Sequence, residues 1–372
     1  MRIAYCIRPE YVNGGDGVQA MKTKEYIEAL KPDYTIDIIT SPEELTVGYD
    51  LAHIFNYATT DLTRAFFERA TALDIKVVSS PVFWDYSYSM VPVTQLMKFN
   101  KDFITEKYVL RQMKWSRLAS AMPYPKLRLI YNNVSKDFRK NIYRFIGQSE
   151  LILPNSQEEG EKCCDFSSCP EMWKRKIRVV YNGVDVSGVK IMDEDAFFTK
   201  YRIPKGYILQ VGRIEYLKNN LNLVAAMMKH PEIPIVFVGS DRGTEKYANN
   251  VREEGKKRGN VYFISNVPHE EIYSFYRYAK THVLLSMRES PGLVSLEALS
   301  QQCPIVVSDE RFCPVKTYFK EQCEIVNPFN KEQIRDAVLR SMQKEHKPVD
   351  LSKFSWEVVA QQTIDAYKEI LG

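Results

Sequence analysis

Two glutamates and a glycine lie in a segment whose pattern is typical of a ligand-binding turn. From Val283 to Asp309 the chain reads VLLSMRESPGLVSLEALSQQCPIVVSD, with Glu289, Gly292 and Glu297 between two apolar strands. We expect a helix to open around Leu293. The turn before it would lie at the carboxyl end of a strand, where open α/β sheets bind ligands. Free backbone N–H groups at the start of the helix suit a phosphate.

The two carboxylates flank this anion site. At about 100° per residue, Glu289 and Glu297 would not share one helix face. They fit better with Glu289 before the helix and Glu297 in its second turn. Carboxylates placed in this way can hold hydroxyl groups on either side of a bound phosphate, as in a sugar nucleotide.

Two cations follow an earlier apolar run. The predicted strand GYILQVG ends at Arg213, and Lys218 stands at the start of the next predicted helix. An arginine fork and a lysine point charge can neutralise a diphosphate without a metal. The alternative is a pair of ordinary surface cations. The Glu289–Glu297 turn two β/α units later favours the diphosphate interpretation.

A glycine-rich turn, NGGDGVQ, follows the first predicted strand. Gly14 and Gly15 would let the backbone approach an anion closely. The turn lacks the G-x-G-x-x-G spacing of a dinucleotide site and the acidic residue expected after the next strand. By itself it predicts at most a contact with a sugar or its phosphate.

Candidate acceptor contacts come from the first half of the chain. His53 lies in a short apolar strand, and Trp84, Tyr86 and Tyr88 lie in an aromatic loop after a strand end. These rings can stack on a sugar acceptor. The alternatives are a buried, hydrogen-bonded histidine and ordinary loop packing. Hydrolase elbows and zinc signatures are absent from the sequence, so no metal or cofactor is expected.

Strands and helices alternate through most of the chain, which predicts an α/β fold with parallel sheets. The 372 residues exceed what one core usually supports. We expect two Rossmann-like domains, over residues 1–188 and 189–355, that face each other across a cleft. A last helix is expected over residues 356–372. KIRVVYN, residues 176–182, is expected to be a strand.

Charge is unevenly distributed. Residues 97–147 hold twelve Lys and Arg against three Asp and Glu, or +9, which leaves 4 − 9 = −5 for the rest. Basic helices with interleaved aromatic residues can rest on anionic lipid or hold an acidic acceptor. The alternative is a solvated helix face, with Trp115, Phe138 and Tyr143 packing the core. A motif for base readout is lacking, so no nucleic-acid partner is expected.

Cysteine usage and hydropathy predict the compartment. Seven cysteines without a signal peptide fit free thiols in a reducing cytosol. The sequence has no apolar run of about 20 residues, as a membrane-spanning helix would need. We therefore expect a cytoplasmic protein with peripheral contact to the inner membrane face through residues 97–147.

Four segments together resemble a known family. VVYNGVD, ILQVGRIEYLKNNLNLVAAM, IVFVGS and ESPGLVSLEALSQQCPIV occur in the order seen in the retaining glycosyltransferases with the E-x7-E motif. The resemblance covers the second half of the chain and is looser over the first. It implies a GT-B fold, with acceptor binding in residues 1–188, nucleotide-sugar binding in residues 189–355 and a last helix, 356–372, that returns to the first domain. It also implies the transfer of a hexose, with retention, from a UDP-, GDP- or ADP-sugar. The implied acceptor is a glycan or lipid-linked saccharide of cell-surface polysaccharide synthesis.

The resemblance also implies roles for individual residues. Arg213 and Lys218, after Gly212, look like the diphosphate ligands, Glu289 like the contact to the donor sugar, and Glu297 like the ribose ligand. The remaining donor contacts implied are Gly15, Val267, Gly292, Leu293 and Val294. Catalysis would depend on Glu289, Arg213 and Lys218, which stabilise the leaving phosphate.

Two departures from the family pattern stand out. Ser290-Pro291 replaces Gly-Phe after the first glutamate, and Pro291 has no N–H to donate. The usual histidine of the first-domain loop is missing from SPVFWDYS, where Phe83, Trp84 or Asp85 takes its place. An epimerase or phosphorylase on the same scaffold, or a non-catalytic sugar-nucleotide-binding scaffold, remain alternatives.

Overall fold

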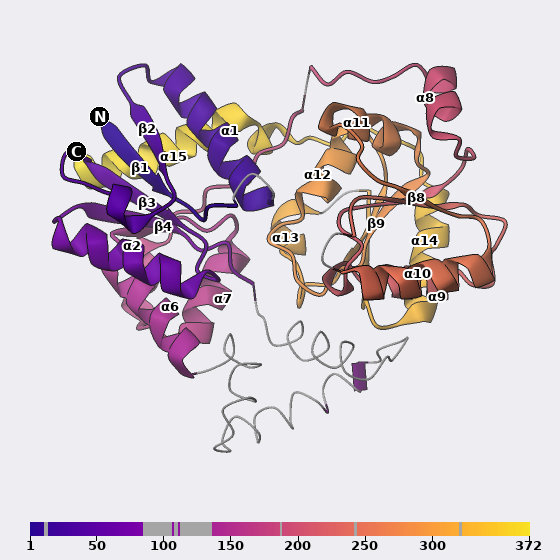
Figure 1. Ribbon diagram of the computed structural model, residues 1–372, viewed down its shortest axis with the longest axis horizontal. Coiled ribbons are helices and arrows are strands. Elements are labelled where there is room, and N and C mark those ends of the chain that lie inside the picture. Colours follow the sequence, from indigo (N-terminus) through magenta and orange to yellow (C-terminus); the bar gives the residue numbers. More distant parts are fainter. Residues whose placement is uncertain are drawn as a thin grey trace. The chain divides into compact units, whose positions relative to one another are not determined.

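The computed structural model describes residues 1–10, 14–84, 106–107, 111, 136–186, 188–241, 244–319 and 322–372. Contacts divide the chain into two compact units. Unit 1 comprises Met1–Asp85, Tyr131–Val184 and Leu351–Gly372, and unit 2 comprises Tyr86–Ile130 and Asp185–Asp350. Each unit is built on one parallel sheet covered by helices, which confirms the expected fold class of two Rossmann-like bodies (Figure 1).

Unit 1 has a five-stranded parallel sheet in the order β2-β1-β3-β4-β5. Its strands are β1 (Arg2–Cys6), β2 (Thr35–Ile39), β3 (Leu51–Phe55), β4 (Lys76–Ser80) and β5 (Leu151–Ile152). The central strands β1 and β3 are almost entirely buried. Their short apolar runs are typical of strands with helices on both faces.

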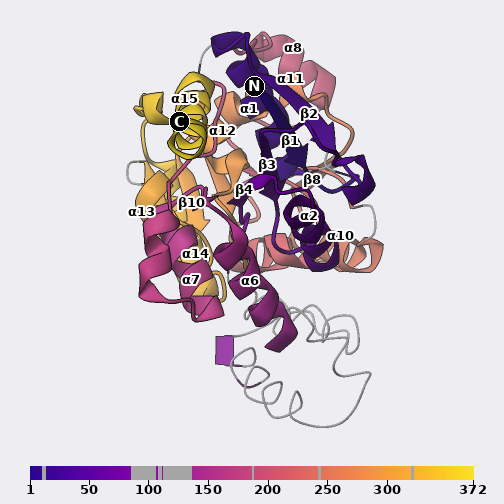
Figure 2. The same ribbon diagram turned by 90° about the vertical axis from the view of Figure 1, so that its left-hand side faces the viewer.

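Helices cover both faces of this sheet. They are α1 (Gly15–Leu30), α2 (Thr60–Ala72), α6 (Lys136–Gln148), α7 (Gln157–Ser167) and α15 (Trp356–Leu371). Short 3₁₀ turns are η2 (Pro42–Glu44), η4 (Glu171–Lys176) and η6 (Ser352–Phe354). The C-terminal helix α15 packs along α1 on one face, while α2, α6 and α7 lie on the other (Figures 1 and 2).

The expected strand at residues 176–182 is wrong. Only Ile177 forms a bridge, with Ile152. Arg178 and Val180 donate their N–H groups to the carbonyls of Ile152 and Pro154, each at 2.9 Å. Pro154 has no N–H to donate, so the ladder cannot be extended past β5.

Unit 2 has a six-stranded parallel sheet in the order β11-β10-β9-β6-β7-β8. Its strands are β6 (Ile208–Val211), β7 (Ile235–Val238), β8 (Val261–Ile264), β9 (Thr281–Leu284), β10 (Ile305–Ser308) and β11 (Cys323–Val326). Numbered from β6, this is the doubly wound order 3-2-1-4-5-6 of dinucleotide-binding sheets. Strand order reverses between β6 and β9, which are hydrogen-bonded neighbours.

The helices of unit 2 also form two layers. They are α8 (Glu194–Tyr201), α9 (Asn220–Ala226), α10 (Glu245–Arg258), α11 (His269–Tyr278), α12 (Leu293–Ser300), α13 (Val315–Tyr318) and α14 (Lys331–Met342), with the 3₁₀ turn η5 (Tyr216–Lys218). Helices α9, α10 and α14 pack together on one face, and α11 packs with α12 on the other (Figure 1).

The sequence expectations about the start of α12 and the places of the two glutamates are confirmed. The helix begins at Leu293, so Glu289 precedes it and Glu297 lies in its second turn.

Among the described residues, no helix combines the length and the apolar character needed to cross a bilayer.

Candidate functional site

The loops after β6 and β9 meet where the strand order of unit 2 reverses. Such a switch point lies at the carboxyl ends of the strands and is where open α/β sheets bind ligands. The N–H of Met287, after β9, donates to the carbonyl of Leu217, after β6, at 2.9 Å. This bond fixes the two loops side by side.

The β6 loop depends on glycine at a close backbone approach. Gly212 has a φ of +131°, and its carbonyl oxygen would lie 2.1 Å from a Cβ placed on Gly239, after β7. A side chain at Gly239 would therefore push the β6 and β7 loops apart. Lys218 packs over Gly212, with its Cε 3.6 Å from where a Cβ would stand.

Lys218 and Glu289 form an ion pair at the centre of this junction. The ammonium contacts Oε1 of Glu289, and both side chains are largely shielded, at 21% and 12% exposure. Ser286, buried two residues after the end of β9, donates its hydroxyl to the same Oε1 at 2.5 Å. Glu289 is thus fixed by a charge from one loop and a hydroxyl from the other.

The turn that carries Glu289 is tied to its neighbours by the backbone. The N–H of Glu289 donates to the carbonyl of Phe312, in the loop after β10, at 2.8 Å. Gly292 caps α12 with a φ of +92°, and Glu289 Cγ lies 3.6 Å from where a Cβ on Gly292 would stand. Leu293 and Val294 open α12 and are half-buried.

Arg213 has a local partner. Its Nη2 lies 3.1 Å from Oε1 of Glu215, and the Arg213 side chain is 63% exposed. The guanidinium therefore lies on the same loop as Lys218, with most of its surface open to a ligand.

Glu297 is held by two residues of α11. Tyr276, fully buried, donates its hydroxyl to Oε2 at 2.8 Å. Nε2 of His269 lies 3.7 Å from Oε1. This contact with the Glu297 carboxylate raises the pKa of His269 above the ordinary value, because the negative charge favours the protonated ring.

The β8–α11 loop approaches Glu297 through this histidine. Val267, half-buried, lies two residues before His269. Tyr273 stacks edge-on with the His269 ring at 5.7 Å and donates to Asp185 at 3.3 Å. The junction therefore extends from Lys218 through the start of α12 to the β8–α11 loop.

The glycine turn of unit 1 is spanned by an ion pair. Arg8 binds both carboxylate oxygens of Asp16 at 2.8 and 2.9 Å, and Asn56 donates to Asp16 at 3.1 Å. Burial raises the pKa of Asp16, but the hydrogen bonds and charge of Arg8 outweigh it and hold the pKa below its usual value. The Arg8 guanidinium covers Gly14, whereas Gly15 is exposed at the first turn of α1.

An open hollow of about 730 Å³ lies beside this turn, within unit 1. It follows the carboxyl ends of β1 and β3 and is closed on one side by α6. Its lining is polar, with Arg8, Glu10, Thr59, Asp137 and Asn141 among the residues that face it. This mixture of hydroxyl, amide, carboxylate and guanidinium groups suits a polyhydroxylated ligand.

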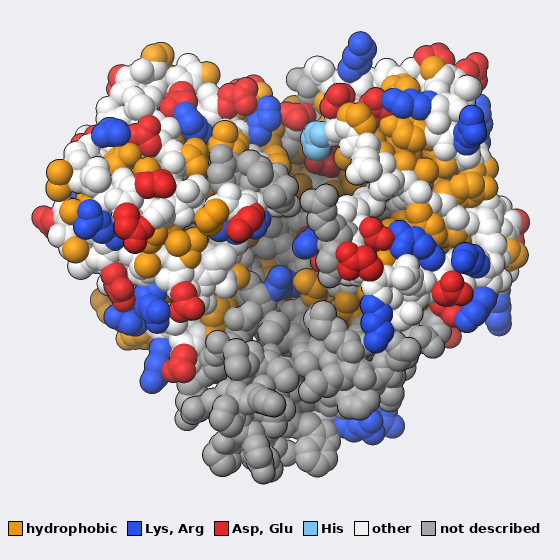
Figure 3. Space-filling view, viewed as in Figure 1, with side chains coloured by type: hydrophobic (Ala, Val, Ile, Leu, Met, Phe, Trp, Pro, Cys, Tyr) orange, Lys and Arg blue, Asp and Glu red, His pale blue; other side chains and the backbone are white. Residues whose placement is uncertain are grey.

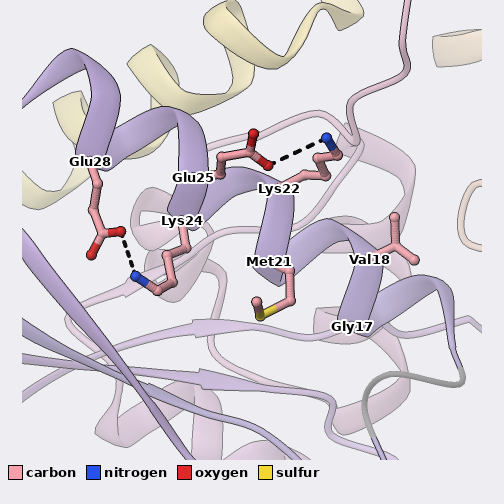
Figure 4. Close-up of a pocket in the computed structure, with 7 residues that line it drawn as sticks. All are labelled: Gly17, Val18, Met21, Lys22, Lys24, Glu25 and Glu28. Atoms are coloured by element: carbon pink, nitrogen blue, oxygen red, sulfur yellow. Dashed lines mark hydrogen bonds and ion pairs between the residues drawn. The ribbon is translucent and has the colours of Figure 1, made fainter.

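A second depression lies along α1 (Figure 4). Its charged residues are engaged with one another, because Lys24 pairs with Glu28 at 2.5 Å and Lys22 with Glu25 at 3.4 Å. Val18 and Met21 supply its apolar part. The depression offers no group prepared for chemistry.

His53 is not placed to meet an acceptor. It is 3% exposed, and its two ring nitrogens bind Tyr367 at 2.7 Å and Ser80 at 2.8 Å. Burial lowers its pKa to about 3. The alternative of a buried, hydrogen-bonded histidine describes this residue.

Trp84 is also buried, at 1% exposure, with the ammonium of Lys162 4.8 Å from its ring centre. Its loop is fixed by the buried carboxylate of Glu159, which accepts the N–H groups of Phe83 and Asn155. Trp84 therefore packs the core instead of stacking on a sugar. Tyr86, Tyr88 and Asp85 lie outside the described residues, as does most of the basic stretch 97–147.

The part of the chain that the structure describes contains no cluster of three or more His, Cys, Asp or Glu side chains arranged to hold a metal ion. Acidic and basic side chains are mixed over the surfaces of both units that Figure 3 displays. Surface charge alone therefore does not distinguish a binding site on this face.

Residues 193–356 match the sequence profile of the family described as glycosyl transferases group 1. The O-antigen chain mannosyltransferase B of Escherichia coli is 28% identical over 183 residues. This match covers 45% of the chain and 48% of the relative, so the chain spans about half of that protein's length.

Two solved structures share the fold over the whole chain. Sucrose-phosphate synthase from Thermosynechococcus elongatus aligns with a TM-score of 0.72 at 16% identity, covering 100% of this chain and 99% of its own. Anabaena HepE, solved in complex with UDP and glucose, aligns with a TM-score of 0.68 at 11% identity, covering 100% of both chains. These two structures show the GT-B fold alone. Over residues 193–356, the sequence therefore matches the glycosyl transferases group 1 family.

Proposed function

We propose that this protein transfers a hexose, with retention, from a nucleoside diphosphate sugar to a saccharide acceptor. One observation carries the proposal: Lys218, Glu289 and the start of α12 converge where the strand order of unit 2 reverses. A cation, a carboxylate and a helix N-terminus at one switch point match the phosphate and the sugar of such a donor.

The donor would replace the Lys218–Glu289 ion pair with two new sets of contacts. The diphosphate would pair with the ammonium of Lys218 and the exposed guanidinium of Arg213. The sugar hydroxyls would donate hydrogen bonds to the carboxylate of Glu289, which Ser286 keeps in place. Glu297, held by Tyr276, would accept hydrogen bonds from the ribose hydroxyls. The half-buried Val267 would lie beside the base. Gly212, Gly292, Leu293 and Val294 would bring backbone groups to the phosphates and sugar.

Transfer would proceed on one face of the sugar. The bond between the anomeric carbon and the phosphate oxygen breaks, and the acceptor oxygen bonds to the same face. The acceptor proton passes to the leaving phosphate. Lys218 and Arg213 lower the barrier by stabilising the charge that develops on this phosphate, which is the role of preorganised donors in such steps.

The acceptor would bind in the polar hollow of unit 1. Thr59, Asp137 and Asn141 offer the donors and acceptors that a saccharide needs. The E. coli relative is named as an O-antigen chain mannosyltransferase, which supports an acceptor of cell-surface polysaccharide synthesis. A lipid-linked saccharide belongs to this class.

The test is turnover with UDP-, GDP- and ADP-hexoses against a panel of saccharide acceptors, with products identified by mass spectrometry and anomeric configuration by NMR. We expect one donor to give a product of retained configuration, and Glu289→Gln to abolish it. Lys256→Ala, on exposed α10, is the matched control. Epimerised donor without acceptor would favour an epimerase, and tight nucleotide binding without transfer would favour a non-catalytic scaffold.

Metal dependence is tested in the same assay. Because Lys218, Arg213 and the α12 start supply the positive charge, we expect turnover to survive EDTA. Activity that EDTA removes and Mg²⁺ restores would contradict this part of the proposal.

A further inference from the structure

One face of α6 carries a stripe of cations around an aromatic ring. Arg139, Lys140, Tyr143 and Arg144 are exposed, whereas Phe138, Ile142, Phe145 and Ile146 are buried. At about 100° per residue, the four exposed residues fall within about 140° of the helix circumference. The helix is therefore anchored by its apolar face and presents the stripe to solvent.

The turn η4 extends this stripe. Trp173 packs over α6, with its ring 4.7 Å from that of Tyr143 and an atom 2.8 Å from where a Cβ on Gly147 would stand. Lys176 donates to the carbonyls of Gly147 and Ser149 at 2.9 and 2.7 Å, which ties η4 to the end of α6. The stripe and the turn therefore form one surface.

The turn adds an exposed apolar side chain to the cations. Met172 is 67% exposed and Tyr143 39% exposed. Arg175 is exposed beside them, and Lys174 is paired with Glu171 at 2.9 Å. We define the α6–η4 surface as Arg139, Lys140, Tyr143, Arg144, Met172 and Arg175.

We propose that the α6–η4 surface docks on an anionic lipid bilayer. Cations near such a bilayer are attracted by its surface potential, and apolar and aromatic tips between them enter the headgroup region. The phosphates of a nucleic acid would also attract these cations, but they offer no apolar contact to the exposed Met172. The mixture of the two kinds of side chain therefore favours lipid.

Helix α6 joins this surface to the hollow of unit 1. Asp137 and Asn141 line the hollow, while Arg139, Lys140 and Arg144 lie on the outer stripe of the same helix. A bilayer at the stripe would bring the headgroup of a lipid-linked saccharide close to the hollow. This last step depends on the acceptor site proposed above, whereas lipid docking does not.

The test is flotation of the full chain, without donor or acceptor, with vesicles of phosphatidylcholine alone or mixed with phosphatidylglycerol. We expect binding only to the mixed vesicles, and weaker binding at high salt because screening shortens the reach of the charges. The double variant Lys140→Glu/Arg144→Glu should lower the partition coefficient at least about tenfold, since each cation near the surface contributes roughly fivefold.

Two further variants keep the proposal falsifiable. Met172→Ser, on an exposed site, should lower partitioning by about threefold without a change in thermal midpoint. Lys256→Glu/Lys257→Glu, on exposed α10, makes the same charge change elsewhere and should bind like the wild type.

Three results would overturn the proposal: no binding to the mixed vesicles, equal binding by Lys140→Glu/Arg144→Glu, or an equal loss in the α10 control. Binding of a single-stranded oligonucleotide without binding of vesicles would assign the surface to nucleic acid instead. None of these results requires sugar transfer, so they do not decide the proposed function.

Discussion

Lys218 and Glu289, which are 71 residues apart in the sequence, form an ion pair between the loops after β6 and β9. The pair links the two strands at which the sheet of unit 2 reverses its order. A donor that binds here must exchange this ion pair for contacts to its phosphate and sugar. The net affinity is therefore the difference between two sets of charged contacts.

Lys218→Ala should weaken the binding of nucleoside diphosphate by about 2 kcal/mol, the scale of a lost charged hydrogen bond. Arg213→Ala should have a smaller effect, because its guanidinium is 63% exposed and screened by solvent. Calorimetric titration with UDP, GDP and ADP measures both. Lys256→Ala serves as control, and unchanged affinity in both site variants would contradict the assigned site.

Ser286→Ala should lower turnover more than nucleotide affinity. Ser286 is buried and donates to Oε1 of Glu289 at 2.5 Å, so its removal frees the carboxylate to rotate. We expect kcat/KM to fall about tenfold, equivalent to the roughly 1.4 kcal/mol of one hydrogen bond to a charged group. The Kd of the free nucleoside diphosphate should stay the same. A parallel loss of nucleotide affinity would show that Ser286 instead maintains the shape of the whole junction.

The sequence predicts the local elements of this site because they depend on local patterns. Apolar runs mark β6 and β9, and the break at Pro291 and Gly292 marks the start of α12. The fold class follows from the alternation of such runs. Short-range physics fixes these features, so a single sequence is enough to predict them.

Long-range pairings do not follow from the same patterns. The contact between Lys218 and Glu289 depends on strand order, which local periodicity does not encode. Ser286 and Tyr276, which hold the two glutamates, resemble any hydroxyl at the end of a strand or in a helix. A search for hydroxyl side chains close in sequence to Glu289 would have found Ser286, three residues earlier.

Burial explains why Trp84 and His53 do not make the acceptor contacts expected from the sequence. The sequence shows Trp84 in a polar aromatic loop. In the structure the N–H of Phe83, the preceding residue, donates to the buried carboxylate of Glu159, which holds the loop against the core. From the sequence alone, Glu159 would be expected to be a solvated glutamate in the first turn of α7. Only the fold shows that its carboxylate is fully enclosed.

Trp84→Ala should therefore destabilise the protein instead of raising the KM for an acceptor. Removal of a fully buried tryptophan leaves a cavity and typically costs 3–5 kcal/mol, so unfolding in denaturant should shift accordingly. Thr59→Ala, in the polar hollow, is the contrasting variant, and it should raise the acceptor KM with little loss of stability. The proposed acceptor site would be contradicted if the two variants showed the reverse pattern.

His269 should titrate above the ordinary histidine value of about 6.5, because Glu297 favours its protonated form. The stabilising contribution of the pair is then fully present below about pH 6.5 and is lost as the pH rises through the raised pKa. NMR titration of the ring proton, assigned with His269→Gln, measures this directly. In Glu297→Gln the pKa should fall toward 6.5, and an unchanged pKa would contradict the contact.

The pKa of His282 is shifted in the opposite direction to that of His269, so it affects stability at acid pH. It is fully buried on β9 beneath Tyr276, and burial, aided by the charge of Lys218, lowers its pKa to about 3. Its Nδ1 has no hydrogen-bond partner among the described residues. The folded state therefore excludes a proton that the unfolded state binds below about pH 6.5, so stability should fall by about 1.4 kcal/mol per pH unit from there down to about pH 3.

His282→Leu should remove this contribution, since a leucine of similar volume binds no proton. Calorimetric stability of the variant should lie within about 1 kcal/mol of the wild type at neutral pH, and it should exceed the wild type increasingly as the pH falls. Val47→Ala, which shortens a 73% exposed side chain that cannot titrate, is the control and should keep the wild-type slope. The buried His53 of unit 1 contributes a similar dependence of stability on pH. His282→Leu should therefore remove only the contribution of His282 and leave that of His53. Equal acid slopes in wild type and His282→Leu would show that this imidazole gains a proton without unfolding, through a polar partner that stabilises its charge.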